Sequence, residues 1–264
     1  MKLLNPKKSL GQNFLIDKNI INIIIEQGNI NENETILEVG PGTGSLTEKI
    51  LLKNPKKIFA IEKDSNLAEK LRDKFSKEIT IINDDILKVD EKKYSSDPMI
   101  VFGNLPYNIS TQILVKWIRY NNLNNTFKKF ILMFQKEVAD RIIAETNSKN
   151  YGRLAILSSW KMNIRKIMDI NPSSFFPSPK VKSSLLVFEP KKDYYKLEDC
   201  KNLEHITNVF FNQRRKMIKK PMGLLFKNFK EVSKSLSLDL NLRPQNISKL
   251  SYYKICSYYE KLHQ

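Results

Sequence analysis

The sequence predicts an α/β protein with a mainly parallel sheet, followed by a smaller, all-helical region at its C-terminal end. Short apolar runs of strand length alternate with segments of helical periodicity over roughly the first two-thirds of the chain. A glycine-rich loop at residues 40–44 lies between one such run and the next helical segment, which is the position that nucleotide-binding α/β proteins use. After a last apolar run at residues 183–188, only helical periodicity remains beyond Pro190.

The N-terminal part begins with a basic arm, residues 1–16, that contains Lys7 and Lys8. Asp17 is a suitable N-cap for a helix that we expect to run to Gln27 and to stop at Gly28. The elements expected next are a strand over residues 35–39, a helix over 45–52, a strand over 57–61, a helix over 64–75 and a strand over 79–82.

A further strand is expected at the apolar run 99–102, and a turn follows it. The remaining expected elements are a helix over residues 109–120, a strand over 130–134, a helix over 136–144, a strand over 183–188 and helices over 202–219 and 246–262. We place a domain boundary near residue 190, which gives domains 1–189 and 190–264.

The composition excludes several classes of protein. With 264 residues, of which 41% are apolar, the chain can bury a substantial core. The sequence contains no apolar run of eighteen residues and no signal-peptide pattern at its start, so we expect a cytoplasmic protein without a membrane anchor, with a monomer as the default. Its two cysteines and two histidines are isolated, so neither a zinc site nor histidine-based catalysis is expected.

The chain is strongly basic, with 45 Lys and Arg against 28 Asp and Glu, a net charge of +17. Such a balance is typical of proteins that bind a polyanion, most often nucleic acid. A coding bias toward lysine is the alternative explanation. The distribution favours binding, because residues 190–264 carry 16 Lys and Arg against 7 Asp and Glu, the densest excess in the chain.

Three successive predicted strands end in residues that suit a nucleoside ligand. Gly40 and Gly42 follow the first, Glu62 follows the second about twenty residues later, where a carboxylate would bind ribose hydroxyls, and Asp85 follows the third, where it suits an adenine amino group. The dinucleotide fingerprint is incomplete, since its third glycine is replaced by Ser45. Glu62 or Asp85 alone would be interpreted as a surface acid or a helix cap; their joint placement favours a ligand.

The fourth strand ends in Asn104, Leu105, Pro106 and Tyr107, which suit a flat ring that bears an amino group. The Asn104 side-chain oxygen and the Leu105 carbonyl can accept hydrogen bonds, Pro106 stiffens the turn, and Tyr107 can stack on the ring. Taken alone, the segment could equally be an ordinary turn. Its place beside the other three strand ends favours a second substrate that meets the first ligand there.

Five segments in this order resemble the S-adenosylmethionine-dependent rRNA adenine N6-dimethyltransferases. They are 10–15 (LGQNFL), 38–44 (EVGPGTG), 102–110 (FGNLPYNIS), 175–181 (FFPSPKV) and 211–216 (FNQRRK). The resemblance extends from about residue 7 to about residue 250, and Leu10, where bacterial members often have Phe, is a small departure. Within the group the chain resembles the bacterial enzymes that dimethylate two adjacent adenines in the 3′-terminal hairpin loop of 16S rRNA in the small ribosomal subunit.

The resemblance implies a Rossmann-like class I methyltransferase fold, a small helical C-terminal domain and S-adenosylmethionine as the cofactor. The cofactor contacts that it implies are Asn13, Leu15, Gly40, Glu62, Asp85 and Asn104. It also implies that Phe175 faces the target adenine opposite Tyr107; from the residues alone, Phe175 would be interpreted as packing.

The predicted helix over 202–219 and its continuation carry a basic cluster: Arg214, Arg215, Lys216, Lys219 and Lys220. At 3.6 residues per turn, Arg215 and Lys219 would share one face of that helix, as would Lys216 and Lys220. We expect this cluster, with Lys7 and Lys8 of the arm, to bind rRNA phosphates; a solvated helix face is the alternative for any single residue.

Three other functions remain alternatives. A DNA adenine methyltransferase is disfavoured by Leu105, where those enzymes usually carry a second proline, and by the segment 12–15 (QNFL). A large-subunit rRNA methyltransferase of the macrolide-resistance type is disfavoured by the match over residues 108–110 and 212–216. A non-catalytic RNA-binding assembly factor with the same fold is disfavoured because Glu62, Asp85, Asn104 and Tyr107 are all present.

Overall fold

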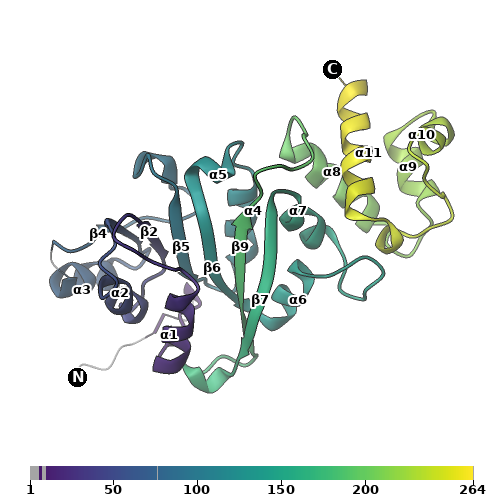
Figure 1. Cartoon of the computed structure of the whole chain (residues 1–264). Helices are drawn as coiled ribbons and strands as arrows, with labels where there is room; N and C mark the ends of the chain where they lie inside the picture. Colours follow the sequence, from purple (N-terminus) through teal and green to yellow (C-terminus); the bar gives the residue numbers. More distant parts are fainter. Residues whose placement is uncertain (1–5, 8–9, 76, 264) are drawn as a thin grey trace. The chain divides into compact units, whose positions relative to one another are not determined.

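The computed structural model describes residues 6–7, 10–75 and 77–263. It contains a seven-stranded sheet in the order β4-β3-β2-β5-β6-β9-β7 (Figure 1). The strands are β2 (Thr35–Val39), β3 (Lys57–Ile61), β4 (Thr80–Ile82), β5 (Met99–Asn104), β6 (Phe127–Gln135), β7 (Met162–Ile170) and β9 (Ser183–Pro190). Strands β2 to β6 pair in parallel, and β9 is antiparallel to β6. The strand order reverses beside β2, so a crevice for ligands is expected there.

Helices cover both faces of this sheet. They are α1 (Lys18–Glu26), α2 (Ser45–Leu51), α3 (Ser65–Phe75), α4 (Ser110–Ile118), α5 (Leu123–Thr126) and α6 (Lys136–Ile142), with a 3₁₀ turn at Glu91–Lys93. Apolar side chains of α1, α2 and α3 form one core cluster with Ile36, Ile58 and Ile100 of the sheet. On the other face, the ring centroid of Trp117 in α4 lies 5.0 Å from that of Phe130 in β6. The predicted α/β layers are confirmed.

A second, two-stranded sheet joins the N-terminal arm to a segment far along the chain. Strand β1 (Phe14–Leu15) pairs antiparallel with β8 (Phe175–Phe176), and the Ile16 amide donates to the Ser174 carbonyl at 2.9 Å. The sequence analysis expected neither strand. Each is only two residues long, too short for a side-chain period to be visible in the sequence.

Several predicted elements match the structure closely. The strands expected over 35–39 and 57–61 are confirmed to the residue. Helix α1 begins after Asp17, whose side chain accepts hydrogen bonds from the backbone amides of Asn19 and Ile20, as its interpretation as an N-cap requires. Strand β7 was not expected; its exposed and half-buried positions carry polar residues such as Arg165 and Lys166, which is typical of a sheet edge.

The chain divides into two compact units, which are described separately. The first contains residues 1–139 and 163–190, and the second contains residues 140–162 and 191–264. The predicted division into 1–189 and 190–264 differs in the segment 140–162, which groups with the C-terminal helices. The reason is burial: all but two residues of α7 (Arg153–Lys161) are buried, so the helix lacks the amphipathic stripe that marks a surface element.

The second unit is helical, as expected. Besides α7 it contains α8 (Cys200–Phe211), α9 (Lys219–Leu225), α10 (Phe229–Ser235), a 3₁₀ turn (Pro244–Asn246) and α11 (Lys249–Leu262). Helix α8 packs against α7, α9 and α11. The Tyr253 hydroxyl of α11 donates to the Ile156 carbonyl of α7 at 3.0 Å, and the Tyr151 hydroxyl donates to the Ile247 carbonyl, also at 3.0 Å. These buried contacts hold α7 in this unit.

The prediction of a continuous helix through residues 202–219 is wrong. Helix α8 ends at Phe211, residues 212–216 form turns, and α9 begins only at Lys219. The buried positions of α8 recur up to Phe210, and the next buried residue is Ile218. Residues 212–216 between them are all polar, so this segment has no apolar side chain to bury against the unit. The helical-face argument for Arg215 with Lys219, and for Lys216 with Lys220, therefore does not hold.

Across the described residues, the structure has no helix that is both long enough and apolar enough to span a membrane.

Candidate active site

A single pocket gathers the predicted strand-end residues of the first unit. Residues that follow β2, β3, β4 and β5 line it, together with the arm residues 10–15, and its empty volume is about 1100 Å³ including its open mouth. Backbone turns, acidic side chains and apolar side chains line it together, which is typical of a ligand site at the strand ends of an α/β sheet. Four segments that are separated in the sequence by about twenty residues or more therefore meet, as the sequence analysis expected.

The loop after β2 has a backbone that requires glycine. Gly40 and Gly42 have φ angles of +70° and +58°, which side chains with a Cβ rarely adopt. A Cβ on Gly42 would also lie 2.8 Å from the Phe14 ring of the arm. The loop and the arm are therefore in close contact, and this contact depends on the missing side chain.

Glu62 is buried just beyond β3 and holds the glycine loop. Its Oε2 accepts a hydrogen bond from the Gly42 amide at 3.1 Å, and its Oε1 accepts one from the Asp64 amide at 2.9 Å. Burial raises the pKa of this carboxyl, while the two backbone donors act in the opposite direction. The acid is fixed by the backbone and lines the pocket, where its remaining lone pairs can accept from hydroxyl groups.

Glu38 is a second buried acid of the pocket, and the sequence analysis noted it only as part of a motif. Its Oε2 accepts from the Thr47 hydroxyl at 2.6 Å, whereas its Oε1 has no hydrogen-bond partner among the described residues. Burial raises its pKa to about 7; the Thr47 hydrogen bond opposes this rise, and the nearby charge of Glu62 adds to it. An acid inside the apolar strand 35–39 was the signal that could have identified it.

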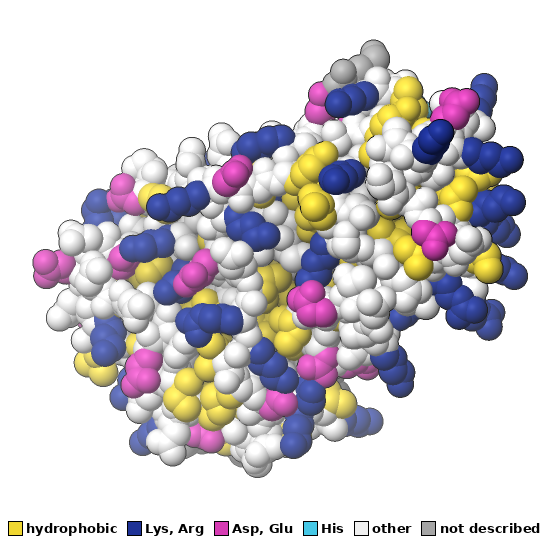
Figure 2. Space-filling model, turned by 45° about the vertical axis from the view of Figure 1, so that its right-hand side comes forward, with side chains coloured by type: hydrophobic (Ala, Val, Ile, Leu, Met, Phe, Trp, Pro, Cys, Tyr) yellow, Lys and Arg dark blue, Asp and Glu magenta, His cyan; other side chains and the backbone are white. Residues whose placement is uncertain are grey.

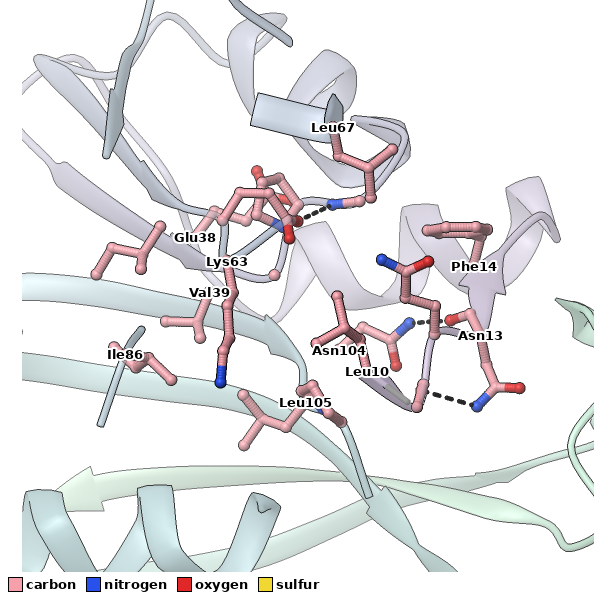
Figure 3. Close-up of a pocket in the computed structure, with 18 of the residues that line it drawn as sticks. Leu10, Asn13, Phe14, Glu38, Val39, Lys63, Leu67, Ile86, Asn104 and Leu105 are labelled. Carbon is pink, nitrogen blue, oxygen red and sulfur yellow. Dashed lines mark hydrogen bonds between the residues drawn. The ribbon is translucent and has the colours of Figure 1, made fainter. Parts of the chain in front are cut away.

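Asp85, after β4, is paired with a residue that the sequence analysis did not consider. The Lys63 ammonium donates to its Oδ2 at 2.8 Å, and the Leu87 amide donates to its Oδ1 at 3.0 Å. The hydrogen bond from Lys63 lowers the Asp85 pKa, and partial burial opposes that effect. In Figure 3, the Lys63 side chain extends past Val39 toward Leu105, so Lys63 contributes to the pocket wall.

The Asn104 amide has a defined orientation. Its Nδ2 donates to the backbone carbonyl of Asn13 at 2.7 Å, and the Asn13 side chain donates in turn to the Gly11 carbonyl at 3.2 Å (Figure 3). Because the nitrogen is used in this way, the Oδ1 atom is the part of the amide that remains to accept a hydrogen bond. The sequence analysis placed both residues at the site but could not foresee this contact.

Tyr107 is also fixed, at its far end. Its hydroxyl shares a hydrogen bond of 2.5 Å with the hydroxyl of Ser183, the buried first residue of β9. Burial raises the Tyr107 pKa, and the hydrogen bond from Ser183 opposes that rise, so the phenol stays neutral at ordinary pH. The ring lines the pocket with Leu105 and Pro106.

Phe175 does not lie where the sequence analysis expected it. Its side chain is 3% exposed, belongs to the apolar core and is not among the residues that line the pocket with Tyr107. The neighbouring Phe176 is 50% exposed. In strand β8 successive side chains point to opposite faces, and Phe175 pairs with buried Leu15, which places its ring inside.

The basic candidates are placed separately. Arg215, Lys216, Lys219 and Lys220 are exposed, and Arg214, also exposed, donates to the Lys149 carbonyl at 2.6 Å. In the arm, Lys7 forms an ion pair with Asp64 at 2.8 Å, and Lys8 lies outside the described residues.

Comparisons with known proteins agree on one family. A family profile described as "Ribosomal RNA adenine dimethylase" matches residues 3–261. The chain is 57% identical over 259 residues to a protein of Pelagibacter ubique named "Ribosomal RNA small subunit methyltransferase A", with 98% of each chain covered. It is 42% identical over 253 residues to a protein of the same name from Ehrlichia ruminantium, covering 93% of this chain and 94% of that one.

Solved structures share the fold. A dimethyladenosine transferase from Plasmodium falciparum superposes with a TM-score of 0.79 at 24% identity, covering 94% of this chain and 98% of that one. The 23S rRNA methyltransferase ErmE superposes with a TM-score of 0.69 at 21% identity, covering 96% of this chain and 100% of that one. At these identities the likeness concerns the fold alone.

Proposed function

Because this chain belongs to the ribosomal RNA adenine dimethylase family, we propose that it dimethylates N6 of two adjacent adenines in the 3′-terminal hairpin loop of 16S rRNA. The methyl donor is S-adenosylmethionine. The observation that carries the proposal is the oriented Asn104 amide, whose Oδ1 remains as an acceptor at the end of a strand beside the pocket. An exocyclic amino group is a donor that matches this acceptor.

The pocket residues fit this cofactor. The Glu38 carboxyl has a buried Oε1 that lacks a partner among the described residues, so it can accept a hydrogen bond from a ligand, and the cofactor has an ammonium group that can donate one. We assign ribose hydroxyls to Glu62 and the adenine amino group to Asp85, with Asn13, Leu15, Gly40 and Gly42 as further contacts. When bound, the cofactor supplies a methyl group that is already activated by its positive sulfonium.

Asn104 and Leu105 are assigned the task of making adenine N6, a poor nucleophile, reactive toward the methyl group. The lone pair of adenine N6 is delocalised into the ring, and hydrogen bonds from N6 to the Asn104 Oδ1 and the Leu105 carbonyl favour a more pyramidal nitrogen. Both acceptors are placed before the substrate arrives, since Leu105 is 1% exposed and Asn104 is held by Asn13. Preorganised dipoles of this kind are the usual main source of rate enhancement.

Tyr107 holds the ring of the target base. Its hydroxyl is tied to Ser183, so the aromatic face has a fixed position on which an extruded base can stack. The same tether and the raised pKa exclude the phenol as a proton acceptor at neutral pH. With Phe175 in the core, stacking is assigned to Tyr107 in this conformation.

Dimethylation makes a second demand on the site. After one methylation, N6 has one N–H left, so it cannot satisfy both the Asn104 and the Leu105 acceptors. The second transfer therefore has to proceed with one of these hydrogen bonds missing and a methyl group beside the turn. A slower second step is the expected kinetic signature.

We assign rRNA binding to the second unit. The protein itself is proposed to act as a monomer in the cytoplasm, on the small subunit or its precursor. The assignment is supported by the exposed cations Arg215, Lys216, Lys219 and Lys220. Figure 2 shows Lys and Arg side chains over the whole visible face, and along its right-hand edge they stand with few acidic side chains and with apolar side chains between them. Phosphate binding releases counterions, so such a surface makes affinity fall steeply with salt.

The residues that follow α8 provide a test of this assignment. Reversing the charges of Arg214, Arg215 and Lys216 to Glu is expected to weaken rRNA binding and to reduce the slope of log affinity against log salt by about two or three. The same change at Lys53, Lys56 and Lys57, exposed residues of the first unit, is the matched control. Equal losses in both variants would move the RNA-binding surface elsewhere.

The proposed reaction is tested with radiolabelled S-adenosylmethionine and four acceptors: unmodified small subunits, large subunits, protein-free 16S rRNA and duplex DNA. Label is expected in the small subunit, and primer extension should stop at two adjacent adenines near the 3′ end of its rRNA. Label found only in large subunits or only in DNA would contradict the proposal.

A further inference from the structure

The described residues of the N-terminal arm, 6–7 and 10–16, are fixed to the first unit at two places. Its residues 10–15 line the pocket, and beyond them the β1–β8 pairing fixes it to the first unit. At its other end the anchor is a single carboxylate, Asp64, which follows Glu62 by two residues. Residues 10–13, which precede β1, line a site that a ligand must enter.

Asp64 holds the arm through two side chains. The Lys7 ammonium donates to its Oδ1 at 2.8 Å and the Gln12 side chain donates to its Oδ2 at 3.0 Å. The Lys7 amide also donates to the Gln12 side-chain oxygen at 2.7 Å, so the three residues form a closed set. Asp64 is 4% exposed, whereas Lys7 is 44% exposed.

The charge of Asp64 is maintained by these contacts. Burial alone would raise the pKa of its carboxyl, but the hydrogen bonds from Lys7 and Gln12 outweigh burial and lower the pKa. A carboxylate that accepts a charge-assisted hydrogen bond from the arm is suited to hold that arm.

The same residues connect to both halves of the reaction site. The Asp64 amide donates to Glu62, which is assigned to the cofactor ribose, at 2.9 Å. On the arm, Asn13 next to Gln12 supplies the carbonyl that orients Asn104, at 2.7 Å. If the arm were released from Asp64, residues 10–15 would cover the cofactor less firmly, and the Asn104 amide, which accepts from the target base, would lose its fixed orientation.

From this arrangement we propose that Asp64 is a positioning residue, which latches the arm over the pocket through Lys7 and Gln12. The closed latch slows cofactor release and keeps the Asn104 amide oriented before RNA binds. The second statement rests on the proposed function; the first requires only that the pocket binds S-adenosylmethionine or its demethylated product, S-adenosylhomocysteine.

The test uses the full-length protein without RNA and measures the dissociation rate of S-adenosylhomocysteine by stopped-flow displacement. Lys7→Met removes the ammonium at nearly the same side-chain length, and Asp64→Asn removes the charge at the same size; the Asn can still accept from the Asn66 amide, which Asp64 caps at 3.1 Å. Lys7→Met is expected to release the ligand about fivefold faster, and Asp64→Asn at least as fast, because it also disturbs the Gln12 contact. The double variant should release the ligand no faster than Asp64→Asn alone, since both substitutions break the Lys7–Asp64 ion pair. Lys7→Arg should restore the slow rate.

Two further measurements separate a latch from a general structural effect. Release from the wild type should accelerate with ionic strength, because salt screens a partly exposed ion pair, and release from Lys7→Met should not. Hydrogen exchange at residues 10–15 of the ligand-free protein should be faster in Lys7→Met and Asp64→Asn only. Lys56→Met is the matched control, since it breaks an exposed pair with Asp97, of 2.6 Å, that is not part of the pocket.

Unchanged release rates, additive effects of the two substitutions or an equal effect of Lys56→Met would overturn the proposal. A Lys7→Met variant that binds RNA more weakly but releases the ligand at the normal rate would also reject it and would make Lys7 an RNA contact. If the latch behaves as expected but no rRNA is methylated, the proposed reaction fails and the latch stands, so the two failures are distinguishable.

Discussion

The pocket has two walls that are held by different forces. The strand-end wall consists of the residues that follow β2, β3, β4 and β5, and it is continuous with strands whose residues Ile36, Leu37 and Val101 are completely buried. The arm wall, residues 10–15, is held by a two-residue strand pair, a few side-chain hydrogen bonds and, at its C-terminal end alone, the buried side chains of Phe14 and Leu15. A wall that continues into a core opens only with global unfolding, whereas one held by few contacts opens locally.

The difference suggests a division of tasks. Glu62 and Leu105, to which we assign contacts with the cofactor ribose and with adenine N6, belong to the strand-end wall. The groups that must move when ligands enter belong to the arm wall. Asn104 belongs to the strand-end wall, but the arm wall orients its amide. A substitution of Asn104 therefore tests the difference between the two walls most directly.

The largest effect is expected for Asn104→Ala. The variant loses the amide acceptor and the contact with the Asn13 carbonyl, and we expect the methyl-transfer rate to fall about 10²- to 10³-fold, as for loss of one preorganised polar group. Cofactor affinity should change much less, because Gly42, Glu62 and Asp85 remain. Single-turnover rates and calorimetric cofactor affinity decide the matter, with Asn122→Ala as the control; equal losses in both quantities would contradict the assigned role.

A smaller effect is expected for Gly42→Ala, which forces the two walls apart. The new Cβ would lie 2.8 Å from the Phe14 ring at a φ of +58°, so the loop or the arm must move. We expect cofactor affinity to fall on the order of fiftyfold, since a displacement of about 1 Å at a binding site can cost that much.

The matched control for that substitution is Gly223→Ala in α9, where a Cβ would be 3.7 Å from the Phe229 ring and the backbone is helical. It should leave the affinity unchanged. If Gly42→Ala and the wild type bind the cofactor with equal affinity, the arm moves aside without cost. That result would contradict the proposed difference between the strand-end wall and the arm wall.

The smallest of these effects is a pH dependence that comes from Glu38. Burial raises its pKa from an ordinary 4.5 to about 7, so the protonated carboxyl is favoured in the free protein, and the associated folding stability is lost as pH rises through about 7. A cationic ligand favours the carboxylate instead. Cofactor affinity should therefore increase roughly tenfold from about pH 6 to pH 8, with release of a proton.

Calorimetry in buffers of different ionisation enthalpy measures both the affinity and the proton release. Glu38→Gln has no titrating group at this position, so its affinity should lose this part of the pH dependence and its binding should release fewer protons. Identical profiles for the variant and the wild type would assign the pH dependence to another group.

The strand-end wall could be predicted from the sequence because its signals are local. An apolar strand followed by Gly40 and Gly42, and strands followed by Glu62, Asp85 and Asn104, identify the wall wherever the strands pair in parallel. The predicted position of Phe175 opposite Tyr107 was taken from the resemblance, and the pairing of β8 with β1 places its ring in the core.

The arm wall and the second unit could not be predicted to the same extent. The contacts Lys7–Asp64 and Asn13–Asn104 join residues 57 and 91 positions apart, and no sequence period encodes them. The end of α8 at Phe211 depends on where buried positions stop, and the segment 212–216 consists of polar residues that fit a helix or a turn equally well.

The Asn13–Asn104 contact has a consequence for how this site tolerates mutation. The group that orients the Asn104 amide is a main-chain carbonyl, which every amino acid at position 13 would supply. Substitution there can remove a side chain but cannot delete the acceptor. Random single substitutions will therefore rarely misorient Asn104. Inserting or deleting one residue between positions 13 and 17, by contrast, will shift the Asn13 carbonyl and so misorient the Asn104 amide.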